Sequence, residues 1–167
     1  AIEAYNKAIL LKPDFAEAYN NIGNALQSQG KLEGSIEAFN KALSLKPDYA
    51  QAHNNLGVAL KDQDNLDKAI EAHKKAISIK PDYAEAYYNM GTTLKNQEKI
   101  NEAIDAYKKA LSIKPDYVDA CCNLGVAFAK QNRLDEAIKA YDKVLLLQPN
   151  YVEVYNKKGD ILKYQGR

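Results

Sequence analysis

The stretch that decides the fold lies at residues 84–117 and reads AEAYYNMGTTLKNQEKINEAIDAYKKALSIKPDY. The single proline of this stretch belongs to a series of five, each 34 residues from the next: Pro13, Pro47, Pro81, Pro115 and Pro149. Five of the eight glycines keep the same spacing: Gly23, Gly57, Gly91, Gly125 and Gly159. A fixed period of this length is typical of solenoids, in which one helical unit stacks on the next.

The period divides the chain into four full units with a partial unit at each end. The full units are 16–49, 50–83, 84–117 and 118–151, and the partial units are 1–15 and 152–167. We expect residues 1–15 to form only a second helix and 152–167 only a first helix, within a single domain over 1–167. The chain opens on Ala1 without a methionine, which favours a fragment of a longer protein.

Each unit predicts two helices joined by a short turn. The first helix of the first full unit carries an apolar stripe at helical spacing: Tyr19, Ile22 and Leu26. A second helix is predicted over 32–46, and Pro47 ends it. We expect Asp14 to cap the first helix, with Glu17 as its capping-box partner three residues on. No segment shows sustained strand alternation, so the predicted fold class is all-α.

The glycine of each first helix requires a steric reason, because glycine inside a helix costs about 0.5–1 kcal/mol relative to alanine. We expect a neighbouring helix to approach closely at this phase. The expected opposing surfaces are two rows of small residues: Ala8, Ala42, Ala76 and Ala110, and Ser35, Ala69, Ala103 and Ala137.

These positions together resemble the tetratricopeptide repeat. In the third full unit the motif residues are Tyr87, Met90, Gly91, Leu94, Ala103, Tyr107, Ala110 and Pro115. The resemblance implies a right-handed superhelix, an α-solenoid whose first helices line a concave groove and whose second helices form the convex back. It also implies that the groove binds a protein segment and that the repeats perform no chemistry. Lys158 departs from the motif by placing a charge where a core leucine is expected. This predicts either a frayed last helix or a different accommodation of the charge in the parent protein.

One row of the first helices is uniform and polar. Asparagine is a mediocre helix former, so its recurrence at one phase indicates a role. We expect these residues to form a ladder that contacts the backbone of an extended peptide, since each amide offers a donor and an acceptor. The alternative is that they hydrogen-bond to adjacent helices at the repeat junction, and the two readings are compatible. The row is Asn21, Asn55, Asn89 and Asn123.

The strings Asn55-Leu56-Gly57 and Asn123-Leu124-Gly125 are similar to repeats of protein O-GlcNAc transferases. That resemblance implies an asparagine ladder that holds a substrate protein. The chain would then be the substrate-recognition arm of a larger enzyme such as a protein O-glycosyltransferase, as an alternative to an independent scaffold.

Two further rows are expected to set the local specificity of peptide binding. One row is Asn20, Asn54, Tyr88 and Cys122, and the other is Asn24, Val58, Thr92 and Val126. We expect the row that begins with Glu17 mainly to cap the first helices. We expect Lys61, Lys95 and Lys163 mainly to be solvated charges on the rim of the groove. One subclass of tetratricopeptide repeats binds the C-terminal carboxylate of a partner protein through lysines on the first helices. The sequence disfavours such a carboxylate clamp, because the first of these rows stands where the first such lysine is expected.

Composition and motifs exclude several other functions. The chain holds 23 Lys and Arg against 22 Asp and Glu, a net charge of +1, which argues against nucleic-acid binding. No apolar run is long enough for a membrane span, and no signal peptide opens the chain. Two histidines, His53 and His73, with Cys121 and Cys122 two units away, do not predict a metal site, and no motif predicts a cofactor or a nucleophile. The adjacent cysteines favour a reducing compartment, hence a cytoplasmic location.

Both ends of the repeat array expose faces that a neighbour should cover. Ile2, Tyr5 and Ile9 lie at one end, and Tyr155, Ile161 and Leu162 at the other. Solenoids ordinarily carry a polar capping helix at each end. A third hypothesis is therefore head-to-tail self-association through the terminal helices, without any peptide ligand.

Overall fold

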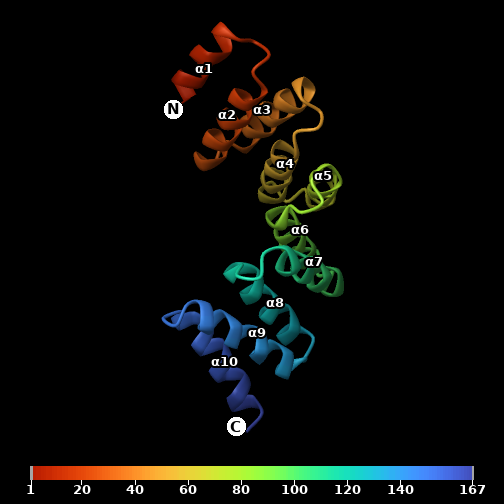
Figure 1. Ribbon diagram of the computed structural model, residues 1–167, viewed down its shortest axis with the longest axis vertical. Coiled ribbons are helices and arrows are strands. Elements are labelled where there is room, and N and C mark those ends of the chain that lie inside the picture. The colour runs from red at the N-terminus through yellow and green to blue at the C-terminus, as the bar shows by residue number, and fades with distance from the viewer. Residues whose placement is uncertain (1, 167) are drawn as a thin grey trace. The chain divides into compact units, whose positions relative to one another are not determined.

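The computed structural model describes residues 2–166, and this range forms ten helices and no strand (Figure 1). The helices are α1 (Ile2–Leu11), α2 (Ala16–Ser28), α3 (Leu32–Leu45), α4 (Ala50–Asp62), α5 (Leu66–Ile79), α6 (Ala84–Asn96), α7 (Ile100–Ile113), α8 (Val118–Lys130), α9 (Leu134–Leu147) and α10 (Val152–Tyr164). The all-α prediction is confirmed, and each full period holds a first helix of 13 residues and a second of 14. The outermost residues of the two predicted partial repeats, 1 and 167, lie outside the described range.

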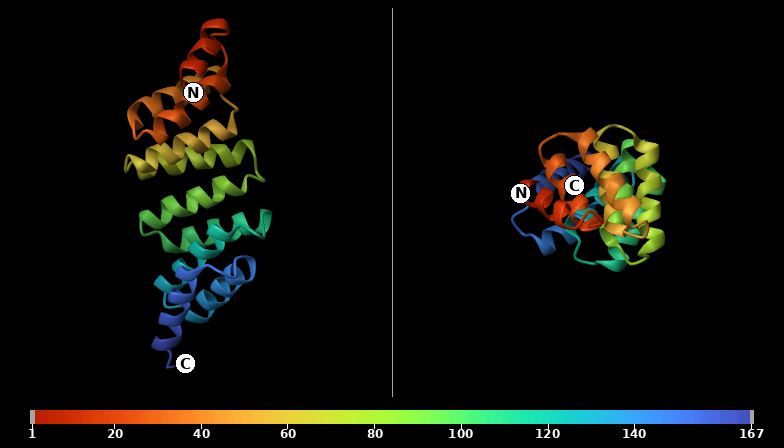
Figure 2. Two further views of the ribbon diagram at one scale, coloured as in Figure 1. Left: turned by 90° about the vertical axis from the view of Figure 1, so that its left-hand side faces the viewer. Right: turned by 90° about the horizontal axis from the view of Figure 1, so that it is seen from above.

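The chain divides into two compact units, one up to Asn89 and one from Met90 onward. In the first unit, successive helices from α1 to α5 pack on one another in chain order, and α2 also touches α4. In the second, α7 packs on α8, α8 on α9, and α9 on α10. Figure 2 shows the layered succession of antiparallel helices inside each unit. The single domain over 1–167 stays a prediction.

The turn inside each repeat is built around one residue in the left-handed region. Gly30 has a φ of 72°, and the residues one, two and three periods later follow it: Asp64 at 62°, Glu98 at 58° and Asn132 at 57°. The next backbone N–H reaches back to the first helix, as in Lys31 N to Leu26 O at 3.0 Å and Asn65 N to Leu60 O at 2.8 Å. This bonding pattern satisfies carbonyls that the end of the helix leaves open, and it turns the chain back on itself.

The first helices begin later than predicted. Helix α2 begins at Ala16 with Phe15 at its N-cap position, and no side chain caps it. The expectation that Asp14 caps this helix is wrong: its backbone carbonyl, not its side chain, accepts from the Ala16 N–H at 3.0 Å. Glu17 is also not a capping partner of Asp14. A backbone hydrogen bond within Glu17 and the ammonium of Lys46, 3.3 Å away, lower the pKa of the Glu17 carboxyl.

The mid-helix glycines do mark close approaches, but their neighbours are ring atoms and not small residues. A Cβ added to Gly23 would lie 2.5 Å from the ring of Phe39, and one added to Gly57 would lie 2.6 Å from the ring of His73. Tyr107 and Tyr141 stand in the same way over Gly91 and Gly125. The ring of the second helix lies against the first helix of its own repeat, which explains why glycine is needed there.

The last helix is formed despite its charged residue. The prediction that Lys158 frays the end is wrong, because α10 runs from Val152 to Tyr164. The Lys158 ammonium lies 2.6 Å from Oδ1 of Asp142 on α9, so the charge is paired where leucine was expected. A Cβ added to Gly159 would meet nothing within 4 Å, in contrast with the four glycines that face a ring.

Candidate functional site

The first helices of the first unit present the asparagine ladder. Helices α2 and α4 are linked directly, by Gln27 Nε2 donating to Asp62 Oδ2 at 2.8 Å and by a second bond between asparagines. Asn21, Asn55 and Asn89 hold the same position in successive repeats, and each is half-buried. A half-buried amide of this kind remains accessible while its packing limits its rotation.

The row immediately before the ladder is buried. Asn20 is 1% exposed and Asn54 is 5% exposed. Asn55 Nδ2 donates to Asn20 Oδ1 at 3.0 Å, and Asn89 Nδ2 donates to Asn54 Oδ1 at 3.1 Å. The expectation that Asn20 and Asn54 face a ligand is therefore wrong: packing between repeats covers them, and they hold the next ladder residue. The alternative reading of the ladder, hydrogen bonding at the repeat junction, is confirmed for Asn55 and Asn89.

Asn54 is also bonded to the second helix of its own repeat. Its Oδ1 lies 3.1 Å from Nδ1 of His73, a ring that is fully buried against Gly57. Burial raises the pKa of the Tyr83 phenol, and the Asn54 amide partly offsets this effect. Burial, and to a lesser extent the charge of Lys61, lower the pKa of His73 to about 4, so this imidazole is neutral at neutral pH.

In the second unit the ladder residue has a different partner. Lys95 Nζ donates to Asn123 Oδ1 at 3.1 Å, so Lys95 is engaged and not a freely solvated rim charge. Lys61, in the first unit, lies 3.0 Å from the carboxylate of Asp62. The hydroxyl of Tyr107 donates to Thr92 Oγ1 at 3.4 Å, which ties that predicted specificity residue to the second helix.

The other predicted specificity residues lie at the half-buried level of the ladder. They are Asn24, Val58 and Tyr88 in the first unit, and Thr92, Cys122 and Val126 in the second. Burial raises the pKa of the Cys122 thiol, and nearby Glu153 adds to the effect. Cys122 is thus a protonated, weakly polar side chain at neutral pH and not an activated nucleophile. Cys121 and Cys122 form no disulfide.

The described part of the chain contains no cluster of metal-ligating side chains. No three His, Cys, Asp or Glu side chains within 2–166 come together as metal ligands. His53 Nε2 lies 2.9 Å from the carbonyl of Pro47, so this ring is bonded within its own repeat junction. No helix within the same range is long and apolar enough to span a membrane.

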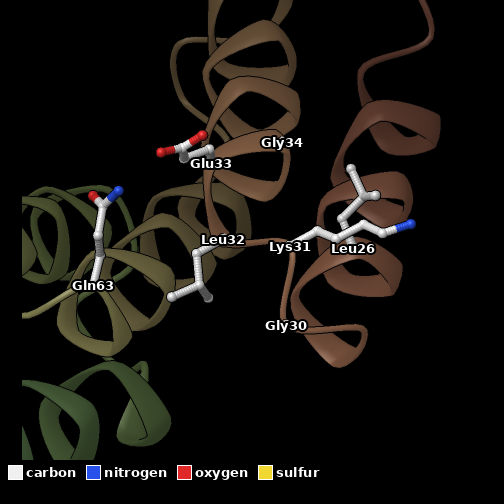
Figure 3. Close-up of a pocket in the computed structure, with 7 residues that line it drawn as sticks. All are labelled: Leu26, Gly30, Lys31, Leu32, Glu33, Gly34 and Gln63. Atoms are coloured by element: carbon white, nitrogen blue, oxygen red, sulfur yellow. The ribbon is translucent and has the colours of Figure 1, made fainter.

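A pocket of about 580 Å³ lies at the α2–α3 turn, and no ladder residue is among those that line it (Figure 3). It is lined by Leu26, Gly30, Lys31, Leu32, Glu33, Gly34 and Gln63. In the close-up, the side chains of Lys31 and Glu33 extend in different directions and do not converge on one point. The pocket thus lacks a set of polar groups that would orient a small substrate.

The hydrogen bonds that Asn20 and Asn54 accept are not among the sequence-based expectations, although the sequence contains a signal for them. The first two full units each hold an Asn-Asn pair at the same phase, Asn20-Asn21 and Asn54-Asn55. The first asparagine of a pair lies 35 residues before the ladder residue that it accepts from, which is one period plus one. This bond is missed when the two rows are considered separately, because it joins the row of Asn20 and Asn54 to the ladder row.

Family comparisons agree with the repeat architecture. A family model described as TPR repeat matches residues 1–30, 24–64, 59–98 and 94–132, and one described as tetratricopeptide repeat matches 118–151. The chain belongs to the tetratricopeptide repeat family. It is accordingly a repeat scaffold for protein interactions, with the α-solenoid fold of that family.

Solved tetratricopeptide structures resemble most of this chain. A crystal structure of MamA is 31% identical, with a TM-score of 0.81, over 91% of this chain and 89% of that one. A second, of MamA protein, is 31% identical, with a TM-score of 0.77, over 92% and 84%. MamA 41-end from Desulfovibrio magneticus RS-1 shares the fold at 21% identity and a TM-score of 0.79, over 90% and 85%. No curated protein sequence matches the chain significantly. The likeness to protein O-GlcNAc transferases, and the role of an enzyme's recognition arm, stay predictions.

Proposed function

We propose that this tetratricopeptide chain is a non-catalytic scaffold whose first helices bind an extended protein segment. The ladder residues that contact the segment's backbone are Asn21, Asn55 and Asn89 in the first unit and Asn123 in the second. The observation that supports this most directly is their common position and half-buried state, because an amide held in that way meets a peptide bond with donor or acceptor at little entropic cost. The cytoplasmic location stays part of the proposal.

Side chains beside the ladder then select among segments. Val58 and Val126 offer apolar contacts, whereas Asn24 and Thr92 are polar, so each repeat favours a different ligand side chain. Tyr88 and Cys122 occupy the position that is buried asparagine in the first two full units. Each hydrogen bond between a ladder asparagine and the backbone of the bound segment contributes on the order of 0.5–1.5 kcal/mol, so measurable affinity requires several ladder residues together.

Selection from a display library of random dodecamer peptides tests this function. The chain is the bait, and affinities of the selected peptides are measured for the chain and for a variant with all four ladder asparagines changed to alanine. The matched control changes Ser44, Ser78 and Ser112 to alanine, since each hydroxyl bonds only a carbonyl of its own second helix. We expect the ladder variant to lose binding by about tenfold or more and the serine variant to keep it. Equal affinities for the chain and a folded ladder variant would refute the ladder.

Head-to-tail self-association is a second candidate, favoured by large apolar side chains that lie open on α1 and α10. Leu10 is 81% exposed, and Val152 and Tyr164 are 69% and 76% exposed. Burying such residues against another copy would remove apolar surface from water. Light scattering over a concentration series measures the assembly, and a strictly monomeric species at the highest concentration would exclude it.

A further inference from the structure

Two buried asparagines perform the same task one repeat apart. Asn20 on α2 accepts a hydrogen bond from Asn55 on α4, and Asn54 on α4 accepts one from Asn89 on α6. In both pairs the donor is the side-chain nitrogen of the ladder residue, and the acceptor is a side-chain oxygen that packing has removed from water. A buried acceptor of this kind is costly to leave unpaired, so the ladder nitrogen is held toward it.

The orientation of Asn54 is fixed from its other side. Its Oδ1 also faces Nδ1 of His73 at 3.1 Å, and the ring N–H donates to it. The His73 ring and the Asn89 side-chain nitrogen therefore converge on the same atom of Asn54, its Oδ1, which fixes which end of that amide faces the ladder.

The consequence for the ladder is clearest at Asn55. The only hydrogen bond of its side chain to any residue within 2–166 is the one from Nδ2 to Asn20. The Oδ1 atom of Asn55 is not among the buried unpartnered oxygens of the described chain, so it is open to solvent. Because the two atoms of an amide point in different directions, holding the nitrogen against the wall turns the oxygen away from it.

We infer that Asn20 and Asn54 set the hydrogen-bonding polarity of the ladder in the first unit, so that Asn55 presents an acceptor and recognises a backbone N–H of the bound segment. This inference rests on the proposed function. It makes Asn20 and Asn54 positioning residues and Asn55 the residue that determines specificity. A segment with proline, or any N-alkylated residue, opposite Asn55 has no N–H to donate and is rejected.

Asn123 in the second unit has a neighbour of another kind. Its side-chain oxygen accepts a hydrogen bond from the Lys95 ammonium at 3.1 Å. The residue before it is Cys122 and not asparagine. The rejection of proline is accordingly predicted for the first unit and tied to Asn55.

The orientation is tested first without any ligand, by ¹⁵N-resolved NMR of the side-chain amides in the intact chain. One proton of Asn55 Nδ2 should exchange slowly, and an Asn20→Leu variant should bring it to the rate of a solvated amide. Asn24→Leu is the matched control, since it removes an amide one turn further along α2 that makes no bond to the ladder among the described residues. Fast exchange of both Asn55 Nδ2 protons in the unmodified chain would overturn the inference, even if the Asn20 variant failed to fold.

The specificity is tested with a peptide selected from the random dodecamer library. Single N-methyl groups are placed along this peptide, and affinities are measured for the chain, for Asn55→Ala and for the control Ser28→Ala, whose exposed hydroxyl bonds only a carbonyl of its own helix. We expect one N-methylated position to lose about tenfold in affinity with the chain and with Ser28→Ala, and less than about twofold with Asn55→Ala. The same loss with Asn55→Ala would overturn the inference while leaving the proposed function standing. Failure to select any binding peptide would instead refute the proposed function and, with it, this deduction.

Discussion

Acidification should destabilise the first unit through His73. Its ring is fully buried against Gly57, its Nδ1 bonds Asn54, and its Nε2 has no hydrogen-bond partner within the described chain. Burial lowers the pKa of His73 from 6.5 to about 4. The unfolded chain therefore takes up the proton at a higher pH than the folded chain does. Stability from this residue is complete above about pH 6.5 and is lost as the pH falls toward about 4.

The size of the effect follows from the shift. Between about pH 7.5 and about pH 5, the two pKa values correspond to a loss of about 2 kcal/mol in the free energy of unfolding, approaching about 3 kcal/mol below pH 4. Carboxyl groups begin to titrate in the same range, so the contribution of His73 has to be isolated by a variant. His73→Phe is suited to this, because Phe39 fills the equivalent position one repeat earlier, against Gly23.

The assay is urea unfolding followed by circular dichroism at both pH values for the chain and for His73→Phe. We expect the stability lost on acidification to be about 2 kcal/mol smaller in the variant. NMR titration of the imidazole gives a second reading, and the resonance of His73 is the one that disappears in the variant. Equal acid-induced losses in the two proteins, or an imidazole that protonates near pH 6.5 in the folded chain, would refute the reasoning.

Three further changes should alter the free energy of unfolding, measured by urea unfolding at neutral pH. Gly125→Ala should destabilise the protein by about 2 kcal/mol, because the new methyl group would lie 2.5 Å from the Tyr141 ring. Gly159→Ala should instead stabilise it by about 0.5–1 kcal/mol, since nothing lies within 4 Å of the new methyl group. Equal effects of the two substitutions would contradict the ring contact. Ser35→Ala should stabilise by about 1 kcal/mol by removing a buried hydroxyl without a partner in the described chain, and destabilisation would reveal a bond made by that hydroxyl. Asp64→Gly should stabilise by about 0.5–1 kcal/mol by relieving a φ of 62°, and no gain would show that the turn is not strained.

The parts of the fold that the sequence predicts are those governed by its 34-residue period. The second helix expected over 32–46 is α3, Leu32–Leu45, because the apolar stripe and Pro47 define it together. The predicted start of the first helix is wrong, since Asp14 resembles a cap in sequence but the backbone becomes helical only at Ala16. A local capping pattern is a weak signal for the exact first residue of a helix, and here the Asp14 carbonyl accepts from the Ala16 N–H before the helix begins.

The candidate site is less predictable, because its polar contacts join different repeats. Periodicity identifies the phase of the ladder, yet it does not show which of two adjacent asparagines turns inward. Asn20 and Asn54 are expected on the surface because asparagine is ordinarily exposed. Their burial depends on a donor supplied by the next repeat, and such a bond is visible only when the stacking distance is known.

The buried asparagines also give the stacking of repeats a directional element. Apolar stripes hold successive helices together, but hydrophobic contact does not specify one register. A hydrogen bond between Asn54 and Asn89 does, because sliding one helix along the other would leave the buried oxygen of Asn54 without its ladder donor. The bond between Asn20 and Asn55 acts in the same way one repeat earlier. The first asparagine of each Asn-Asn pair thus holds the ladder residue of the next repeat through a bond that only one register satisfies.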